Sequence, residues 1–74
     1  MVLVMEHMTL SQTLVAEMEA AASKLGIEPS TLGERAGQGG RFYSRLKDGK
    51  RVWPETAAKV RDWISANAPD VKAS

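Results

Sequence analysis

The stretch from Gly39 to Pro54 combines cationic and aromatic side chains with neighbouring glycines. Residues 41–51 hold five bases and one acid, although the net charge of the whole chain is only +1. Such local asymmetry is typical of a surface that binds a polyanion, whereas the simpler interpretation is a solvated basic face without a partner. The bases are Arg41, Arg45, Lys47, Lys50 and Arg51, and the aromatic residues are Phe42, Tyr43 and Trp53.

The two halves of the chain carry opposite charge. Residues 1–33 hold one base against four acids, whereas residues 34–62 hold eight bases against four acids. A polyanion would therefore bind to the second half, because like charges repel it from the first. The acidic first half remains a second candidate surface, which would serve a protein partner instead.

The sequence contains no complete set of groups for catalysis. It offers no Ser/His/Asp set or paired carboxylate site, and the glycine-rich residues 37–40 lack the preceding strand that a nucleotide-binding loop needs. The chain has no cysteine, and a single histidine, His7, cannot hold zinc alone. We therefore expect neither an enzyme nor a cofactor, a metal or a small-molecule ligand, and cysteine usage favours the cytosol.

A chain of 74 residues, 43% of them hydrophobic, predicts one small domain with one core. No segment approaches the roughly 20 apolar residues that cross a bilayer, so we expect no membrane association. The apolar start "MVLVM" is too short for a signal-peptide core. We expect a flexible segment over residues 1–8, a folded domain over 9–68 and a flexible tail over 69–74.

The first helix is predicted to run from Leu10 to about Leu25. Thr9 and Gln12 have the spacing of a capping box, and Gly26 is a typical helix C-cap. The apolar residues share one face at helical spacing, and Glu17 and Glu19 are predicted to lie off that face. The apolar residues are Leu10, Leu14, Met18, Ala21, Ala22 and Leu25.

Three more helices are predicted, each opened or closed by proline or glycine. The second runs from Pro29 to Ala36, and the third from Gly40 to Asp48, with Gly39 and Gly40 as the hinge into it. The fourth begins at Pro54 and is stopped by Asn67 and Pro69, and no strand pattern competes. The predicted buried faces are Leu32 with Ala36, then Phe42, Tyr43 and Leu46, then Ala57, Val60 and Ile64.

The second and third predicted helices are each about two turns long, with about three residues between them. That pattern fits two helices crossing steeply in a helix-turn-helix unit rather than an antiparallel hairpin. Gly33 in mid-helix costs roughly 1 kcal/mol relative to alanine, which close contact with the next helix would explain. Gly37, four residues later, is predicted to make the turn itself.

The segment "PSTLGERAGQGGRFYSRLKDGKRVWPETAAKV" resembles the DNA-binding domain of phage lambda-type repressors and Cro proteins, the Xre-like helix-turn-helix group. The resemblance covers roughly residues 10–66 and implies a small all-α, lambda repressor-like four-helix domain with a central helix-turn-helix. Gly39 and Gly40 stand where that family has a hydroxyl cap on its recognition helix. The matching residues are Leu32, Gly33, Ala36, Gly37, Tyr43, Arg45, Leu46, Gly49, Lys50, Arg51, Thr56, Lys59 and Val60.

The resemblance implies that the third helix, residues 40–48, lies in the major groove of duplex DNA. Its outward side chains would then contact base edges, and arginine suits bidentate bonding to guanine. The side chains near its ends and at the start of the second helix would contact phosphates, which gives affinity and register but little sequence information. The expected base contacts are Gln38, Arg41, Ser44 and Arg45, and the expected phosphate contacts are Ser30, Thr31, Gly40, Tyr43, Lys47, Lys50 and Arg51.

Several of these residues also have a purely structural interpretation. Arg45 can pair with Glu34 or Asp48 instead of a base. The aromatic side chains raise the possibility of base stacking on single strands, but the helical spacing of Phe42 favours the core. Trp53, beside a proline, is predicted to cover the core beneath its loop, and Trp63 is left open between core and partner surface.

The function expected from the resemblance is that of a Cro- or repressor-like transcriptional regulator of a phage or bacterium. It would act in the bacterial cytosol or nucleoid, as a homodimer on a palindromic operator of double-stranded DNA, with half-sites about one turn apart. Trp63 and Ile64 are the candidate dimer surface. Two alternatives remain: an excisionase-like, architectural or antitoxin-type DNA-binding protein, and a helical protein-interaction module or phage-encoded inhibitor without DNA binding.

Overall fold

The structure is a computed structural model that describes residues 9–69. These residues form four helices and, within that range, no strand, which confirms the prediction of a small all-α domain. No helix in the described range has the length and apolar character needed to cross a membrane. The helices are α1 (Leu10–Leu25), α2 (Pro29–Arg35), α3 (Phe42–Lys47) and α4 (Pro54–Asn67).

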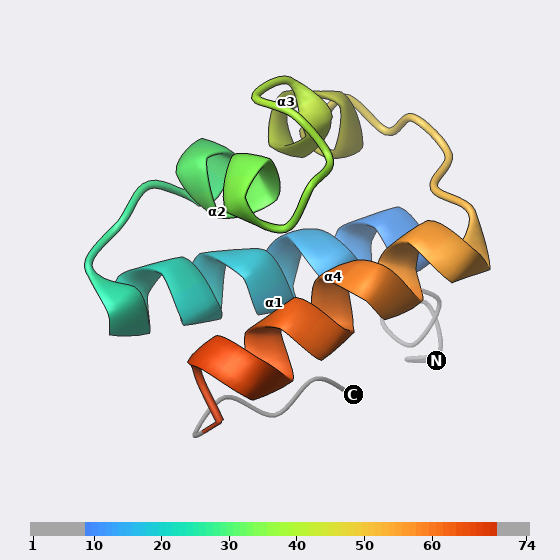
Figure 1. The fold of residues 1–74 in the computed structure, drawn as a ribbon. Coiled ribbons are helices and arrows are strands. Elements are labelled where there is room, and N and C mark those ends of the chain that lie inside the picture. Colours follow the sequence, from blue (N-terminus) through green and yellow to red (C-terminus); the bar gives the residue numbers. More distant parts are fainter. Residues whose placement is uncertain (1–8, 70–74) are drawn as a thin grey trace, which may run out of the picture.

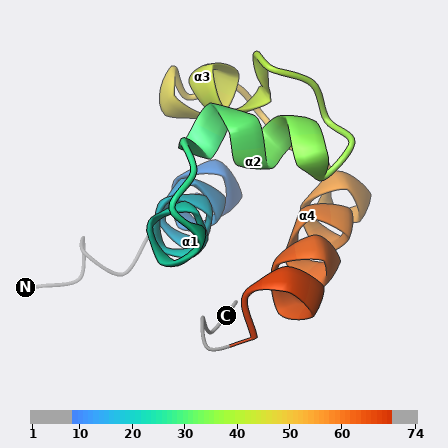
Figure 2. The same ribbon diagram turned by 60° about the vertical axis from the view of Figure 1, so that its left-hand side comes forward.

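Helix α1 is the centre of the fold, because it contacts each of the other three helices. Helices α2 and α3 lie together on one side of α1, and α4 runs alongside α1 in the same general direction (Figure 1). The view in Figure 2 shows α2 spanning the space above α1 and α4, with α3 behind it. Helix α3 thus packs against α1 and α2 with one side and leaves its other side uncovered.

The core lies where these helices meet. The five largest fully buried side chains come from α1, α2 and α4. Leu46 and Val52 close the core beneath α3 and the loop that follows it. These five are Leu14, Met18, Leu32, Val60 and Ile64, all of them at predicted core positions.

The predicted ends of α1 are confirmed. The Thr9 hydroxyl accepts a hydrogen bond from the Gln12 amide N–H at 3.1 Å, and the Gln12 side-chain oxygen accepts one from the Thr9 N–H at 2.9 Å. This reciprocal capping box satisfies two donors that a helix start leaves without partners. At the other end Gly26, in the left-handed conformation, ends the helix.

The turn after α2 is made by Gly37, as predicted. Its φ of +85° lies in the left-handed region, which a Cβ disfavours. The Gly37 N–H donates to the Glu34 carbonyl at 3.0 Å, and the Gln38 N–H donates to the Gly33 carbonyl at 2.9 Å. This pair of bonds is a Schellman motif, which satisfies the last carbonyls of α2 and turns the chain toward α3.

Gly33 lies where α2 and the residues leading into α3 approach each other, as expected from its position in mid-helix. A Cβ added at Gly33 would lie 3.4 Å from the Gly39 carbonyl oxygen and 3.6 Å from the Phe42 Cβ. Both distances are ordinary van der Waals contacts. The approach is therefore close, yet it leaves room for one methyl group.

The predicted start of α3 at Gly40 is wrong, because the helix begins at Phe42. Gly39 has a φ of +90°, which no right-handed helix accommodates. Residues 36–41 therefore form the turn between α2 and α3. No side chain caps α3, and Arg41 occupies the N-cap position without a hydrogen bond from its side chain. The third helix is consequently shorter than predicted, by two residues at its start and one at its end.

The prediction that Glu17 lies off the buried face of α1 is also wrong. Glu17 is 6% exposed and its carboxylate accepts hydrogen bonds from the Arg61 guanidinium of α4, at 2.7 and 3.1 Å. Burial of a carboxylate is tolerated only where a partner compensates the lost hydration. This ion pair joins α4 to α1.

Candidate functional site

The outward face of α3 carries the side chains that the resemblance assigns to base contacts. Arg41, Ser44 and Arg45 are all exposed, whereas Leu46 is buried and Phe42 half-buried on the opposite face. The helical repeat explains this division, because positions three and four apart share a face. Asp48, at the C-cap, is exposed on the same face as the two arginines.

Both arginines of this face are available to a ligand. Within residues 9–69 neither Arg41 nor Arg45 forms an ion pair, so the structural alternative of Arg45 pairing with Glu34 or Asp48 is not realised. Neither guanidinium would therefore have to break an ion pair within this region to bind an anion. That lowers the cost of binding compared with a paired cation.

Three more exposed cations lie at the end of α3 and in the loop that follows it. Lys47, Lys50 and Arg51 are exposed. The Lys47 ammonium lies 5.7 Å from the centre of the Tyr43 ring, and the Arg51 guanidinium lies 5.7 Å from the centre of the Trp53 ring. Such cation–π contacts hold a side chain in place while leaving its charge at the surface.

The loop that carries Lys50 and Arg51 is fastened to α1. The buried hydroxyl of Ser11 donates a hydrogen bond to the Lys50 carbonyl at 2.6 Å. Sequence reasoning missed this residue, although Ser11 stands three residues before Leu14 and so falls on the buried face of α1. Ser11 is thus a positioning residue for the two cations.

The remaining expected DNA contacts are less well placed. Ser30, Thr31 and Gln38 are half-buried, the first two in the first turn of α2 and the third in the turn after it. Gly40 is exposed, but a Cβ there would lie 2.7 Å from a carboxylate oxygen of Glu34. An acid therefore stands beside Gly40, where a phosphate contact was expected.

Tyr43 is half-buried and binds a surface carboxylate of α1. Its hydroxyl donates a hydrogen bond to the Glu19 carboxylate. That bond, then burial, then the negative charges of Glu19 and Glu28 raise the pKa of Tyr43 to about 12. The contact with Glu19 replaces the phosphate contact expected for Tyr43, because a phosphate would have to approach a carboxylate.

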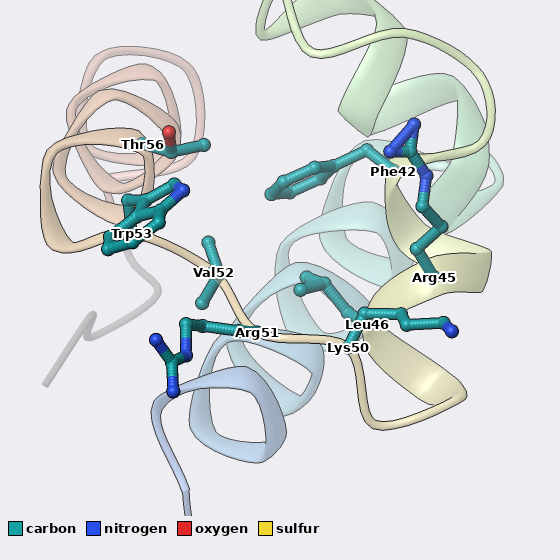
Figure 3. Close-up of a pocket in the computed structure, with 8 residues that line it drawn as sticks. All are labelled: Phe42, Arg45, Leu46, Lys50, Arg51, Val52, Trp53 and Thr56. Carbon is teal, nitrogen blue, oxygen red and sulfur yellow. The ribbon is translucent and has the colours of Figure 1, made fainter.

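The predicted position of Trp53 is wrong, since this side chain is 61% exposed. Val52 is buried in its place, and successive residues of an extended segment point to opposite sides. Trp53 consequently flanks an open groove of about 470 Å³ between α3 and the start of α4. Figure 3 shows Phe42 and Trp53 projecting toward each other across this groove, with Leu46 and Val52 between them.

The candidate dimer surface is corrected in part. Ile64 is fully buried in the core, because it shares the inward face of α4 with Val60 and Ala57, so it presents no surface to a second chain. Trp63 is half-buried and packs against the core, which leaves only part of its side chain for a partner.

No family model, curated protein or solved structure matches this chain. The interpretation of the site therefore depends on its own geometry and charge.

Proposed function

We propose that the chain is a sequence-specific double-stranded DNA-binding transcriptional regulator that places α3 in the major groove. The observation that carries this proposal is the outward face of α3, where Arg41 and Arg45 are exposed on either side of Ser44 without ion-pair partners in the described region. Arginine side chains bind the O6 and N7 atoms of guanine in pairs of hydrogen bonds. Such contacts read the sequence of a base pair directly.

The dimensions of α3 suit this role. Its six residues extend about 9 Å at 1.5 Å per residue, and a helix fits a major groove about 12 Å wide. The helix rests on α1 and α2 by its apolar side, so its polar side is free to enter the groove. Helix α3 would contact only a few base pairs, and a second protomer would have to supply the rest of an operator.

The exposed cations at the end of α3 provide the affinity that is independent of sequence. Lys50 and Arg51 lie on a loop held by Ser11, where they meet the phosphates beside the groove. Each phosphate contact releases condensed counterions from the DNA, so the affinity falls as salt rises. We propose that the protein binds as a homodimer on a palindromic operator in the bacterial cytosol, with Trp63 near the contact between protomers.

A protein-interaction module that uses the acidic first helix is the weaker alternative. Two of the acids that would form its surface already bind elsewhere within the domain: Glu17 pairs with Arg61, and Glu19 accepts from Tyr43. A partner would have to compete with both contacts. An excisionase-like or antitoxin-type protein would use the same face of α3, and it differs in biological role rather than in this surface.

A salt titration of binding to random duplex DNA tests the proposal. We expect binding at low salt and a linear fall of log K with log salt concentration. Removing the charge of Arg51 with Arg51→Ala should reduce the slope by about one, whereas the matched variant Lys59→Ala, on an exposed position of α4, should leave it unchanged. Undetectable binding at low salt would refute the proposal.

A further inference from the structure

The groove between α3 and α4 is lined by aromatic and apolar side chains that the proposed contacts with DNA bases do not involve. Trp53 is the exposed large hydrophobic side chain of the described region, and it forms one wall. The Phe42 ring reaches toward it from α3, and Leu46 and Val52 form the apolar floor (Figure 3). Exposing an indole to water is unfavourable, so an occupant that covers it would gain apolar burial.

One side of the Trp53 indole is already supported. The Arg51 guanidinium lies 5.7 Å from the indole centre, and Figure 3 shows it below the indole. This cation–π contact helps to hold the indole beside the groove, where Trp53 remains 61% exposed. A planar group that entered the groove could stack on the Trp53 indole, with the edge of the Phe42 ring beside it (Figure 3).

The charge at the rim is entirely positive. Arg45, Lys50 and Arg51 line the groove, and no carboxylate is among the residues that line it. The volume of about 470 Å³ is within the range of roughly 300–1,000 Å³ that is usual for small-ligand sites. Aromatic walls with a cationic rim suit a flat aromatic group attached to phosphates.

We propose that this groove takes one unpaired nucleobase of a DNA strand, stacked on the Trp53 indole beside Phe42, with the flanking phosphates on Lys50 and Arg51. The inference depends on the proposed function, because Arg45 and Lys50 belong to both surfaces and the unpaired base would lie beside the duplex that α3 binds. The protein then prefers DNA in which a base next to its site is bulged or overhanging.

A peptide is the less suitable occupant. An extended peptide carries N–H and C=O groups that need partners when they leave water. Of the side chains that line the groove, only the Thr56 hydroxyl provides an acceptor, and the other polar groups are the Trp53 indole N–H and the three cations. A stacked base keeps its polar edge at the open side of the groove and buries only its faces.

The test compares a perfectly paired duplex with the same duplex carrying a single-nucleotide bulge. We expect the bulged duplex to bind roughly tenfold more tightly, which is the range of one base–aromatic stacking contact. Trp53→Ala should abolish this preference, because it lowers the affinity for bulged DNA more than that for the paired duplex, which changes only as far as Arg51 loses its cation–π contact. Because Trp53 is exposed, the variant should fold, which circular dichroism verifies.

Fluorescence reports directly on the groove. The chain has two tryptophans, so Trp63→Phe leaves Trp53 as the only indole. Bulged DNA should then change the Trp53 emission more strongly than paired DNA at equal saturation. The matched variant Trp53→Phe, which keeps Trp63, should show no such difference between the two DNAs.

The outcomes separate this inference from the proposed function. Absence of binding to either DNA would overturn both. Equal affinity for paired and bulged DNA, or an equal loss of both in Trp53→Ala, would overturn the base-binding groove alone. Displacement of Trp53-bound DNA by an acidic aromatic peptide, without any preference for the bulge, would assign the groove to a protein partner and likewise overturn it.

Discussion

The Glu17 carboxylate, buried on α1, accepts two hydrogen bonds from the Arg61 guanidinium on α4. The side chain of Arg61 is 30% exposed, whereas that of Glu17 is 7% exposed. The two partners are therefore unequal: removing the arginine leaves a carboxylate without water, and removing the carboxylate leaves a cation that reaches solvent. The pair joins α4 to α1 in addition to the apolar core between them.

Arg61→Met should therefore destabilise the domain more than Glu17→Met. Breaking a buried pair costs 3–5 kcal/mol, and the partial exposure of Arg61 reduces this to about 2 kcal/mol. The double variant Glu17→Met/Arg61→Met should recover much of the loss, because no buried charge remains. Urea denaturation of the three variants measures the effect, and a double variant less stable than Arg61→Met would contradict it.

Tyr43 should ionise well above its ordinary pKa. The bond to Glu19 holds the phenol neutral and raises the pKa of Tyr43 to about 12 from 10.0. Since the folded-state pKa is raised, the contribution of this contact to stability is complete below pH 10 and is lost as pH rises toward 12. Ultraviolet absorbance of the single tyrosine follows this titration.

The matched variants for this titration are Glu19→Gln and Glu55→Gln. Glu19→Gln should lower the midpoint of the phenol titration, because it removes the negative charge and the strongest acceptor. Glu55, in the first turn of α4, is absent from the causes of the shift and should leave the midpoint where it was. An unchanged midpoint in Glu19→Gln would show that the Tyr43 hydroxyl is free for another partner.

Alanine should have opposite effects at two glycines of the α2–α3 turn. Gly37→Ala forces a Cβ into the left-handed region and should cost about 1–2 kcal/mol. Gly33→Ala places a methyl group at ordinary contact distances in mid-helix and should stabilise α2 by up to about 1 kcal/mol. Thermal denaturation compares the two, and a lower midpoint for Gly33→Ala would mean that the helices cannot accommodate the methyl group.

Arg41 and Lys50 should contribute differently to DNA binding, the first to sequence preference and the second to overall affinity. Arg41→Ala, on the reading face of α3, should reduce the preference between operator and random DNA by about 1–3 kcal/mol per lost base contact. Lys50→Ala should weaken binding to both DNAs alike and reduce the salt slope by about one. Competition titrations on a site selected from a random DNA pool measure both, and identical behaviour of the variants would mean that α3 does not read bases.

The helices themselves follow from the sequence, because their signals act over a few residues. Thr9 and Gln12 start α1 through bonds across one turn, Gly37 ends α2, and Pro54 opens α4. The spacing of apolar residues at three and four positions along each helix likewise predicts that Leu14 and Val60 lie in the core. Within the basic segment the same periodicity separated the outward Arg45 from the inward Leu46.

The predicted start of α3 at Gly40 is wrong, although the residues that decide it, Gly39 and Gly40, are neighbours in the sequence. Two consecutive glycines are compatible with either a hinge or a first helical turn, and only the conformation of Gly39 decides between them. That conformation depends on how the turn must close to bring Phe42 against α2. The two glycines therefore belong to the turn, and the helix begins after Arg41.

Contacts between distant residues decided the rest. Glu17 is buried only because Arg61, 44 positions later, supplies the compensating charge. The Tyr43 hydroxyl is engaged by Glu19, 24 positions earlier. Trp53 is exposed because Val52 occupies the inward position of the same loop. The sequence alone determined the helices, their apolar faces and the clustering of positive charge, because these are properties of neighbouring residues. The tertiary structure decided which polar groups are paired and which aromatic side chain faces solvent, since burial and pairing depend on helices brought together from different parts of the chain.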